Sequence, residues 1–96
     1  MMVVITYDVN THTNEGRRRL RRVAKACEDY GQRVQLSVFE CLVEPEQFAV
    51  LKERLLHEYD PTKDSLRFYF LGKNWKNRVE HQGSKSIVDI EGPLII

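Results

Sequence analysis

The first eight residues constrain the fold of this chain more than any other segment. Residues 2–8 read Met-Val-Val-Ile-Thr-Tyr-Asp, so apolar side chains occupy both sets of alternating positions. Because alternate residues of a strand face opposite sides of a sheet, this pattern is typical of a central strand that is covered on both faces. The strand ends in a carboxylate, Asp8. The sequence therefore predicts a sheet built around residues 2–8, with a polar group at its carboxyl end.

Two segments with helical periodicity follow this strand. The first helix is predicted from about Asn14, whose side chain is expected to cap the first free amides, to Gly31. The second is predicted from Pro45, which suits a first helical position, to the stop at Asp60-Pro61. Their apolar stripes are Leu20, Val23, Ala24, Cys27 and Tyr30 in the first helix, and Phe48, Leu51, Leu55 and Tyr59 in the second.

The remaining apolar segments are predicted to be strands. Residues 34–43 are rich in β-branched and aromatic side chains and would run for about 33 Å if fully extended. This exceeds a typical strand, so a bulge or break is expected inside the segment. Residues 66–71 are predicted to form a strand that ends at Gly72, residues 87–90 a later one, and residues 79–81 a short one between them.

Two helices and four strands in this order predict an α+β fold of the ferredoxin-like split βαβ type (βαββαβ), with both helices on one face of an antiparallel sheet. Ninety-six residues suffice for one modest core, so residues 1–96 are expected to form a single domain. The uncovered sheet face would be apolar, which predicts a homodimer packed through that open face. Residues 83–96 are expected to be a C-terminal extension whose apolar end adds a strand to a sheet edge, that of the partner subunit.

Composition argues against several classes of protein. The longest unbroken apolar stretch, residues 1–5, is far shorter than the roughly 20 residues that span a bilayer, and no signal-peptide pattern follows it. We therefore expect a cytoplasmic protein with no membrane partner. Cys27 and Cys41 fit neither a disulfide framework nor the paired spacing of a zinc site, so both are expected to be buried as small hydrophobes.

Asp8 is the first candidate for chemistry. A carboxylate at the end of a buried strand costs free energy unless a positive or hydrogen-donating group meets it. In a dimer packed through the open face, two copies of Asp8 would approach each other, and paired carboxylates with water are ligands that Mg²⁺ accepts. The alternative is an Asx-type turn, in which Asp8 bonds the amides of its own loop. His12, in that loop, is the one histidine placed to move a proton.

Positive charge is concentrated in the first helix, although the net charge of the chain is only +1. Residues 17–25 carry six of the fifteen Lys and Arg residues. Three of them are predicted to point away from the apolar stripe and to contact phosphates: Arg18, Arg22 and Lys25. Arg17 lies at the margin of the stripe and could reach the sheet end that carries Asp8. The alternative is a solvated helix face whose charge is offset by nearby acidic residues.

Two further segments contain candidate binding residues. The first follows the strand of residues 66–71 and offers Lys73, Lys76 and Arg78 to phosphates, with Trp75 either stacking on a base or packing over the core. The second lies in residues 34–43, where Ser37 and Phe39 are expected on one strand face. Ser37 has no adjacent base, so its hydroxyl is expected to donate to a phosphate or carboxylate, or to be an ordinary strand serine.

A strand ending in Tyr7-Asp8, an Arg-bearing first helix and the strand Gln35-Leu-Ser-Val-Phe-Glu40 together resemble CRISPR-associated protein 2, a small ferredoxin-like adaptation protein. The terminal Gly92-Pro-Leu-Ile is most similar to chains of type I-C systems. The resemblance implies a homodimer that shares a divalent metal, Mg²⁺, between the two copies of Asp8. It also implies that Arg17 contacts phosphate, and that Asp8, Arg17, Ser37 and Phe39 form the family's catalytic motif.

The resemblance further implies that the dimer bridges CRISPR integrase subunits and holds a short DNA duplex, and that it can act as an endonuclease on duplex DNA or single-stranded RNA. Three interpretations remain open at this point. The chain is a metal-dependent nuclease, or a scaffold that binds DNA without chemistry, or a ferredoxin-like regulatory domain that binds a small ligand. The sequence favours the scaffold slightly over the nuclease, because it offers a single acidic side chain per subunit at the site.

Overall fold

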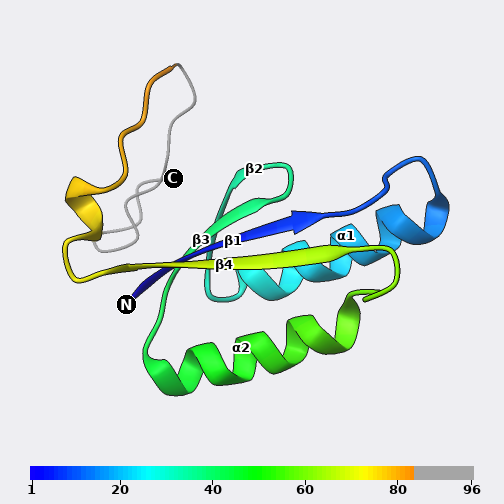
Figure 1. Ribbon diagram of the computed structural model, residues 1–96, viewed down its shortest axis with the longest axis horizontal. Coiled ribbons are helices and arrows are strands. Elements are labelled where there is room, and N and C mark those ends of the chain that lie inside the picture. The colour runs from blue at the N-terminus through cyan, green and yellow to red at the C-terminus, as the bar shows by residue number, and fades with distance from the viewer. Residues whose placement is uncertain (84–96) are drawn as a thin grey trace.

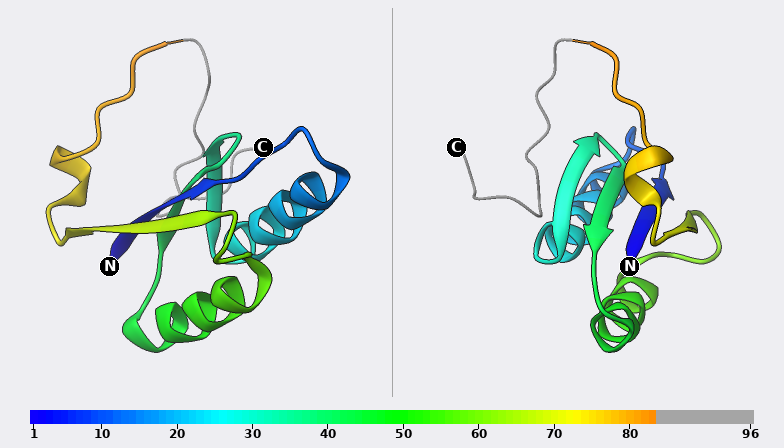
Figure 2. Two further views of the ribbon diagram at one scale, coloured as in Figure 1. Left: turned by 45° about the vertical axis from the view of Figure 1, so that its right-hand side comes forward. Right: turned by 90° about the vertical axis from the view of Figure 1, so that its left-hand side faces the viewer.

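The structure is a computed structural model that describes residues 1–83. Its elements in chain order are β1 (Met2–Asp8), α1 (Asn14–Glu28), β2 (Gly31–Gln35), β3 (Val38–Leu42), α2 (Pro45–Glu58), β4 (Ser65–Gly72) and a short 3₁₀ helix, η1 (Trp75–Asn77). The strands form one sheet in the order β2-β3-β1-β4, and every pair is antiparallel. Both helices lie on the same side of this sheet (Figures 1 and 2). The predicted α+β, ferredoxin-like fold is confirmed.

The core lies between the sheet and the two helices. Val3, Ile5 and Tyr7 of β1 face the helices and are buried, as are Leu20, Val23, Ala24 and Cys27 of α1, whereas Tyr30 lies beyond α1 and is partly buried. On α2, Leu51 and Leu55 are fully buried, and Phe48 and Tyr59 pack against them. The structure thus confirms the predicted central position of β1. Cys27 and Cys41 are also buried and free, as predicted.

The break expected inside residues 34–43 is confirmed, and it divides the segment between two strands. The chain forms a hairpin there, in which β2 and β3 are joined by a turn at Leu36 and Ser37. Gly31 begins β2 instead of ending the first helix, which stops at Glu28. A Cβ atom at Gly31 would lie 2.1 Å from the carbonyl oxygen of Glu40. Glycine is therefore needed here because the two strands approach closely.

Four smaller predictions also need correction or fall outside the described residues. The N-cap of α1 is Thr13 and not Asn14, since the Thr13 hydroxyl accepts a hydrogen bond of 3.0 Å from the amide of Gly16. Residues 79–81 form no strand. The predicted strand of residues 87–90 and nearly all of the extension predicted at residues 83–96 lie outside the described residues. No helix within residues 1–83 is long and apolar enough to cross a membrane.

Candidate nucleic-acid and metal site

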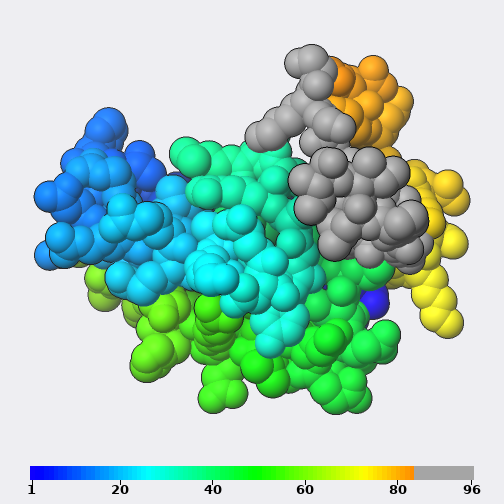
Figure 3. Space-filling model, turned by 180° about the vertical axis from the view of Figure 1, so that it is seen from behind, coloured from blue at the N-terminus to red at the C-terminus, as the bar shows by residue number. Residues whose placement is uncertain are grey.

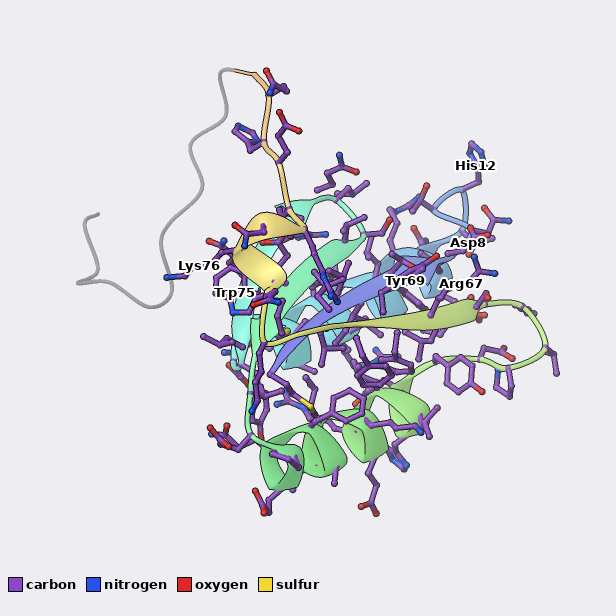
Figure 4. All side chains as sticks on the ribbon, turned by 60° about the vertical axis from the view of Figure 1, so that its left-hand side comes forward. Asp8, His12, Arg67, Tyr69, Trp75 and Lys76 are labelled. Carbon is purple, nitrogen blue, oxygen red and sulfur yellow. The ribbon has the colours of Figure 1, made fainter. Side chains whose placement is uncertain are left out.

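Asp8 lies on the face of the sheet that the helices leave open. It is exposed at the end of β1 and pairs with Ser65 of β4, while Thr6 pairs with Arg67. Directly paired residues of an antiparallel sheet share one face, so Arg67 is a neighbour of Asp8 on the open face. Figure 4 shows Asp8 and Arg67 at the same end of the sheet, with His12 on the loop beyond them. Arg67 is held by a hydrogen bond of 3.1 Å to the Tyr69 hydroxyl.

Ser37 borders the same hollow as Asp8. This hollow has a volume of about 390 Å³. Its lining comprises Thr6, Tyr7, Asp8, Val9, Thr11, Leu20, Leu36 and Ser37. Ser37 belongs to the turn between β2 and β3 rather than to a strand, and its carbonyl oxygen accepts a hydrogen bond of 2.9 Å from the amide of Tyr7. The turn therefore brings Ser37 to the end of β1, which its position in the sequence did not reveal.

One chain does not complete a metal site around Asp8. Within residues 1–83, no group of three or more His, Cys, Asp or Glu side chains is placed to hold an ion together. Asp8 is an exposed carboxylate with oxygen ligands that suit Mg²⁺, which also retains several waters. Because Mg²⁺ is commonly held by one or two carboxylates together with water and substrate phosphates, Asp8 fits such an ion, and a second copy of the chain would supply a second carboxylate.

Arg17 lies at the Asp8 end of the molecule. Its guanidinium donates a hydrogen bond of 2.8 Å to the carbonyl oxygen of Thr11, and it also bonds the side chain of Asn14. The contact with Thr11 ties Arg17 to the loop that leaves β1, and the contact with Asn14 holds it against the first residue of α1. Its side chain remains exposed, so it is accessible to an anion near that loop.

Phe39 is placed differently from the other members of the sequence motif. It is fully buried, pairs with Ile5 and has the Arg33 guanidinium 5.7 Å from the centre of its ring. A side chain without exposed surface cannot touch a nucleic acid. Phe39 can influence the site only by supporting β1 from the neighbouring strand.

The exposed basic residues that follow Arg17 on α1 fall into two groups. Arg18 and Arg21 are exposed and form no ion pair within residues 1–83, whereas Arg22 lies 2.7 Å from Glu58 and Lys25 lies 3.0 Å from Asp29. Figure 3 shows the side of the molecule on which α1 and α2 lie next to each other. A shallow groove of about 450 Å³ there is lined by Arg18, Arg21, Arg22, Lys25, Arg54 and Glu58. Arg21 and Arg54 were not predicted as binding residues.

The second basic segment lies at the opposite end of the sheet from Asp8. The β1–β4 register places Asp8 beside Ser65 and Met2 beside Gly72, directly before Lys73. Figure 4 shows Trp75 and Lys76 at that far end. Lys76 lies 5.6 Å from the Trp75 ring centre, and Arg78 donates a hydrogen bond of 2.7 Å to the carbonyl oxygen of Leu71. The two predicted basic segments therefore do not form one patch around Asp8.

Sequence reasoning missed a buried ionic cluster beneath β1. Arg19 donates two hydrogen bonds to Asp64, of 2.7 and 3.1 Å, and the Tyr7 hydroxyl also donates to this carboxylate. Burial acts to raise the pKa of Asp64, but the hydrogen bonds from Arg19 and Tyr7 outweigh it and lower that pKa. One signal could have revealed Arg19: it precedes Val23 by four residues and so shares the buried helix face.

Fold and site together define a ferredoxin-like protein with one carboxylate at the end of its central strand and a basic surface on its first helix. The family model for CRISPR associated protein Cas2 matches residues 1–79, so the chain belongs to that family. The resemblance inferred from the sequence is thereby confirmed.

Individual relatives agree with this assignment. The chain is 64% identical over 96 residues to a protein of Chlorobaculum tepidum named CRISPR-associated endoribonuclease Cas2, with 100% of each chain covered. It is 57% identical over 95 residues to a protein of Halalkalibacterium halodurans named CRISPR-associated endonuclease Cas2, which covers 99% of each. The crystal structure of Streptococcus pyogenes Cas2 at pH 6.5 matches with a TM-score of 0.81 and 63% identity, over 86% of this chain and 100% of that one. These names confirm the endonuclease activity that the family resemblance implied, whereas the residues alone had favoured a scaffold slightly.

Proposed function

We propose that this chain is a cytoplasmic, homodimeric endonuclease of CRISPR adaptation whose active site forms between two copies of Asp8. One observation carries the proposal. Asp8 is an exposed carboxylate on the open sheet face, and the same face presents the half-buried Val4, Val38 and Leu42. A second copy that covers these apolar side chains, among which Glu40 also lies, would bring the two Asp8 residues to a shared interface. Each chain then contributes half of the ligand set.

The residues of the site have separable roles in this mechanism. The two copies of Asp8 would hold a divalent ion, proposed to be Mg²⁺. When bound, such an ion stabilises charge on a phosphoryl oxygen and lowers the pKa of a bound water. Arg17 holds a phosphate at the loop end of the site, and the Ser37 hydroxyl can donate to a phosphate oxygen across the hollow. Phe39 supports β1 from within the core. These groups bind and orient a phosphodiester, which suits both single-stranded RNA and duplex DNA as substrates.

A second function is favoured by the separation of the basic segments. Lys73, Lys76 and Arg78 follow β4 at the far end of the sheet from Asp8, and Arg18 and Arg21 lie on α1, on the other side of the sheet from the open face (Figure 1). Phosphate contacts at these places hold a duplex without placing it for cleavage at Asp8. We therefore propose that the dimer also binds duplex DNA across these surfaces and bridges CRISPR integrase subunits during spacer acquisition.

Asp8→Asn tests both functions with one variant, because it nearly preserves shape and removes the charge that a divalent ion needs. We expect cleavage in the presence of Mg²⁺ to fall by at least about 100-fold, while duplex binding persists. Glu53→Gln, which also removes one exposed carboxylate but lies on α2, should cleave like the wild type.

Spacer insertion in cells is measured with the same two variants. If Asp8→Asn still supports spacer insertion, the cellular function is to bridge the integrase subunits. If Asp8→Asn loses both insertion and cleavage, insertion requires catalysis. Cleavage that survives Asp8→Asn would contradict the placement of the active site at Asp8.

A further inference from the structure

The buried cluster of Tyr7, Arg19 and Asp64, here called the Asp64 cluster, connects three parts of the fold. Arg19 lies on α1, Tyr7 is the penultimate residue of β1, and Asp64 directly precedes β4. The Asp64 side chain has no exposed surface and also accepts a hydrogen bond of 3.0 Å from the amide of Asp60. Both oxygens of the Asp64 carboxylate therefore accept hydrogen bonds. The cluster has one arrangement in which all of these hydrogen bonds are formed.

Folding alone does not account for this cluster. Burying an ion pair costs desolvation free energy, and apolar side chains in its place are often as stable. The core is already closed by apolar residues such as Val23, Leu51 and Leu55, all fully buried. The cluster lies on the helix side of the sheet at the carboxyl end of β1, where the chain leaves the sheet and the strand would otherwise fray. This location suggests that the cluster holds the end of β1 in the sheet.

Two peptide bonds connect the cluster to Asp8 and to the residue paired with it. Tyr7 is bonded to Asp8 along β1, and Asp64 is bonded to Ser65, the residue that pairs with Asp8 across the sheet. The hydrogen bond from Tyr7 to Asp64 therefore fastens the strands on the helix side directly beside the Asp8–Ser65 pair. Because consecutive residues face opposite sides, a fixed Tyr7 ring also fixes the backbone from which the Asp8 side chain projects to the open face.

We propose that the Asp64 cluster is a positioning device that holds the Asp8 carboxylate in the orientation needed for a shared ion and a bound phosphodiester. This inference rests on the proposed function of Asp8. A carboxylate that must meet its counterpart from a second subunit tolerates little displacement, since a shift of about 1 Å in a reacting group can cost roughly 100-fold in rate. Tyr7, Arg19 and Asp64 do not touch the substrate and act only through Asp8.

Tyr7→Phe is the most specific test, because it removes the hydroxyl group and leaves the ring in the core. Partners that orient a metal ligand typically change metal affinity or activity by about 10- to 100-fold. We expect Tyr7→Phe to weaken Mn²⁺ binding, measured by electron paramagnetic resonance titration, within that range. The kcat for cleavage should fall while KM for the nucleic acid changes little. Asp64→Asn, which also disturbs Arg19, should have a larger effect in the same direction.

Leu51→Ala provides the control for lost stability. Leu51 is fully buried on α2 and its truncation should lower the melting temperature at least as much as Tyr7→Phe. We expect Leu51→Ala to retain the wild-type affinity for Mn²⁺ at temperatures where both variants are folded. Equal loss of Mn²⁺ affinity in the two variants would overturn the proposal, because the cluster would then act only through stability.

Amide hydrogen exchange separates this inference from the proposed function. If Asp8→Asn binds Mn²⁺ as tightly as the wild type, the metal site is misplaced and Mn²⁺ no longer reports on Asp8. The amides of Asp8 and Ser65 should still exchange faster in Tyr7→Phe than in Leu51→Ala, by about 10-fold or more if the hydrogen bond to a charged acceptor is lost. Equal exchange rates in the two variants would overturn the positioning role regardless of the metal.

Discussion

The salt dependence of duplex binding tests which cations of α1 contact phosphates. Arg18 and Arg21 form no ion pair within residues 1–83, whereas Arg22 lies 2.7 Å from Glu58. A cation that already has a carboxylate partner must give up that partner before it can neutralise a phosphate. Replacing Arg18 with Gln should therefore weaken binding more than the same change at Arg22, although both residues are exposed arginines of one helix.

The size of the effect follows from counterion release. Each phosphate contact contributes about −0.9 to the slope of log K against log salt concentration. Arg18 and Arg21 from both subunits of a dimer would contribute about −3.6, which weakens binding roughly 150-fold between about 50 and 200 mM salt. Arg18→Gln would reduce this contribution to the slope to about −1.8, which weakens binding by roughly 12-fold over the same salt range.

Fluorescence anisotropy of a labelled duplex, titrated at several salt concentrations, measures these slopes directly. Glu58→Gln is the complementary variant, because it releases Arg22 and should make the slope steeper. Arg22→Gln should change the slope less than Arg18→Gln does. The reasoning is refuted if Arg18→Gln leaves the slope unchanged, or if the two arginine variants are indistinguishable.

Four further predictions concern the assembly and its stability. Light scattering at micromolar concentration should give twice the chain mass, and a stable monomer would contradict the interface on the open face. Leu55→Ala should lower the free energy of unfolding by about 2–5 kcal/mol in denaturant titrations, because Leu55 is fully buried. The pKa of Asp64 is lowered, so its contribution to stability should be present above a pH of about 4 and be lost as the pH falls further. Burial and the Asp64 carboxylate raise the pKa of Tyr7, so stability should also fall as the pH rises above about 10, and Tyr7→Phe should remove this alkaline loss.

The order of elements could be predicted because the chain's periodicities are clear. The apolar residues of β1 and of the two helices recur at the spacing of their elements, and their burial matches that spacing. The break within residues 34–43 was predicted from their length, but its position was not, because the turn Leu36-Ser37 lacks the Gly, Asn or Asp that usually marks a two-residue turn. Gly31 also misled the prediction, since a glycine after a helical pattern normally indicates a helix end.

The charged residues were harder to predict than the fold. Periodicity gives the face on which a charged side chain lies, but not its partner. Arg22 meets Glu58 and Arg19 meets Asp64 across 36 and 45 positions of sequence, because α1 packs beside α2 and above the loop before β4. Tertiary packing therefore decides whether a basic residue can contact phosphate. It pairs Arg22 with Glu58 and leaves Arg18 without an ion pair within residues 1–83, although helical periodicity places both on the outer face.

The location of Asp8 was predictable for a different reason. A strand end is a local feature, and the alternation of residues 2–8 already assigns Tyr7 to one face and Asp8 to the other. The alternation could not show which group the Tyr7 hydroxyl binds. The structure shows that Tyr7 meets a buried carboxylate on the helix side while Asp8 stands on the open side. Tyr7 thus contributes to the fold on the helix side, and Asp8 contributes to the site on the open side. A substitution at Tyr7 should therefore alter the position of the Asp8 carboxylate.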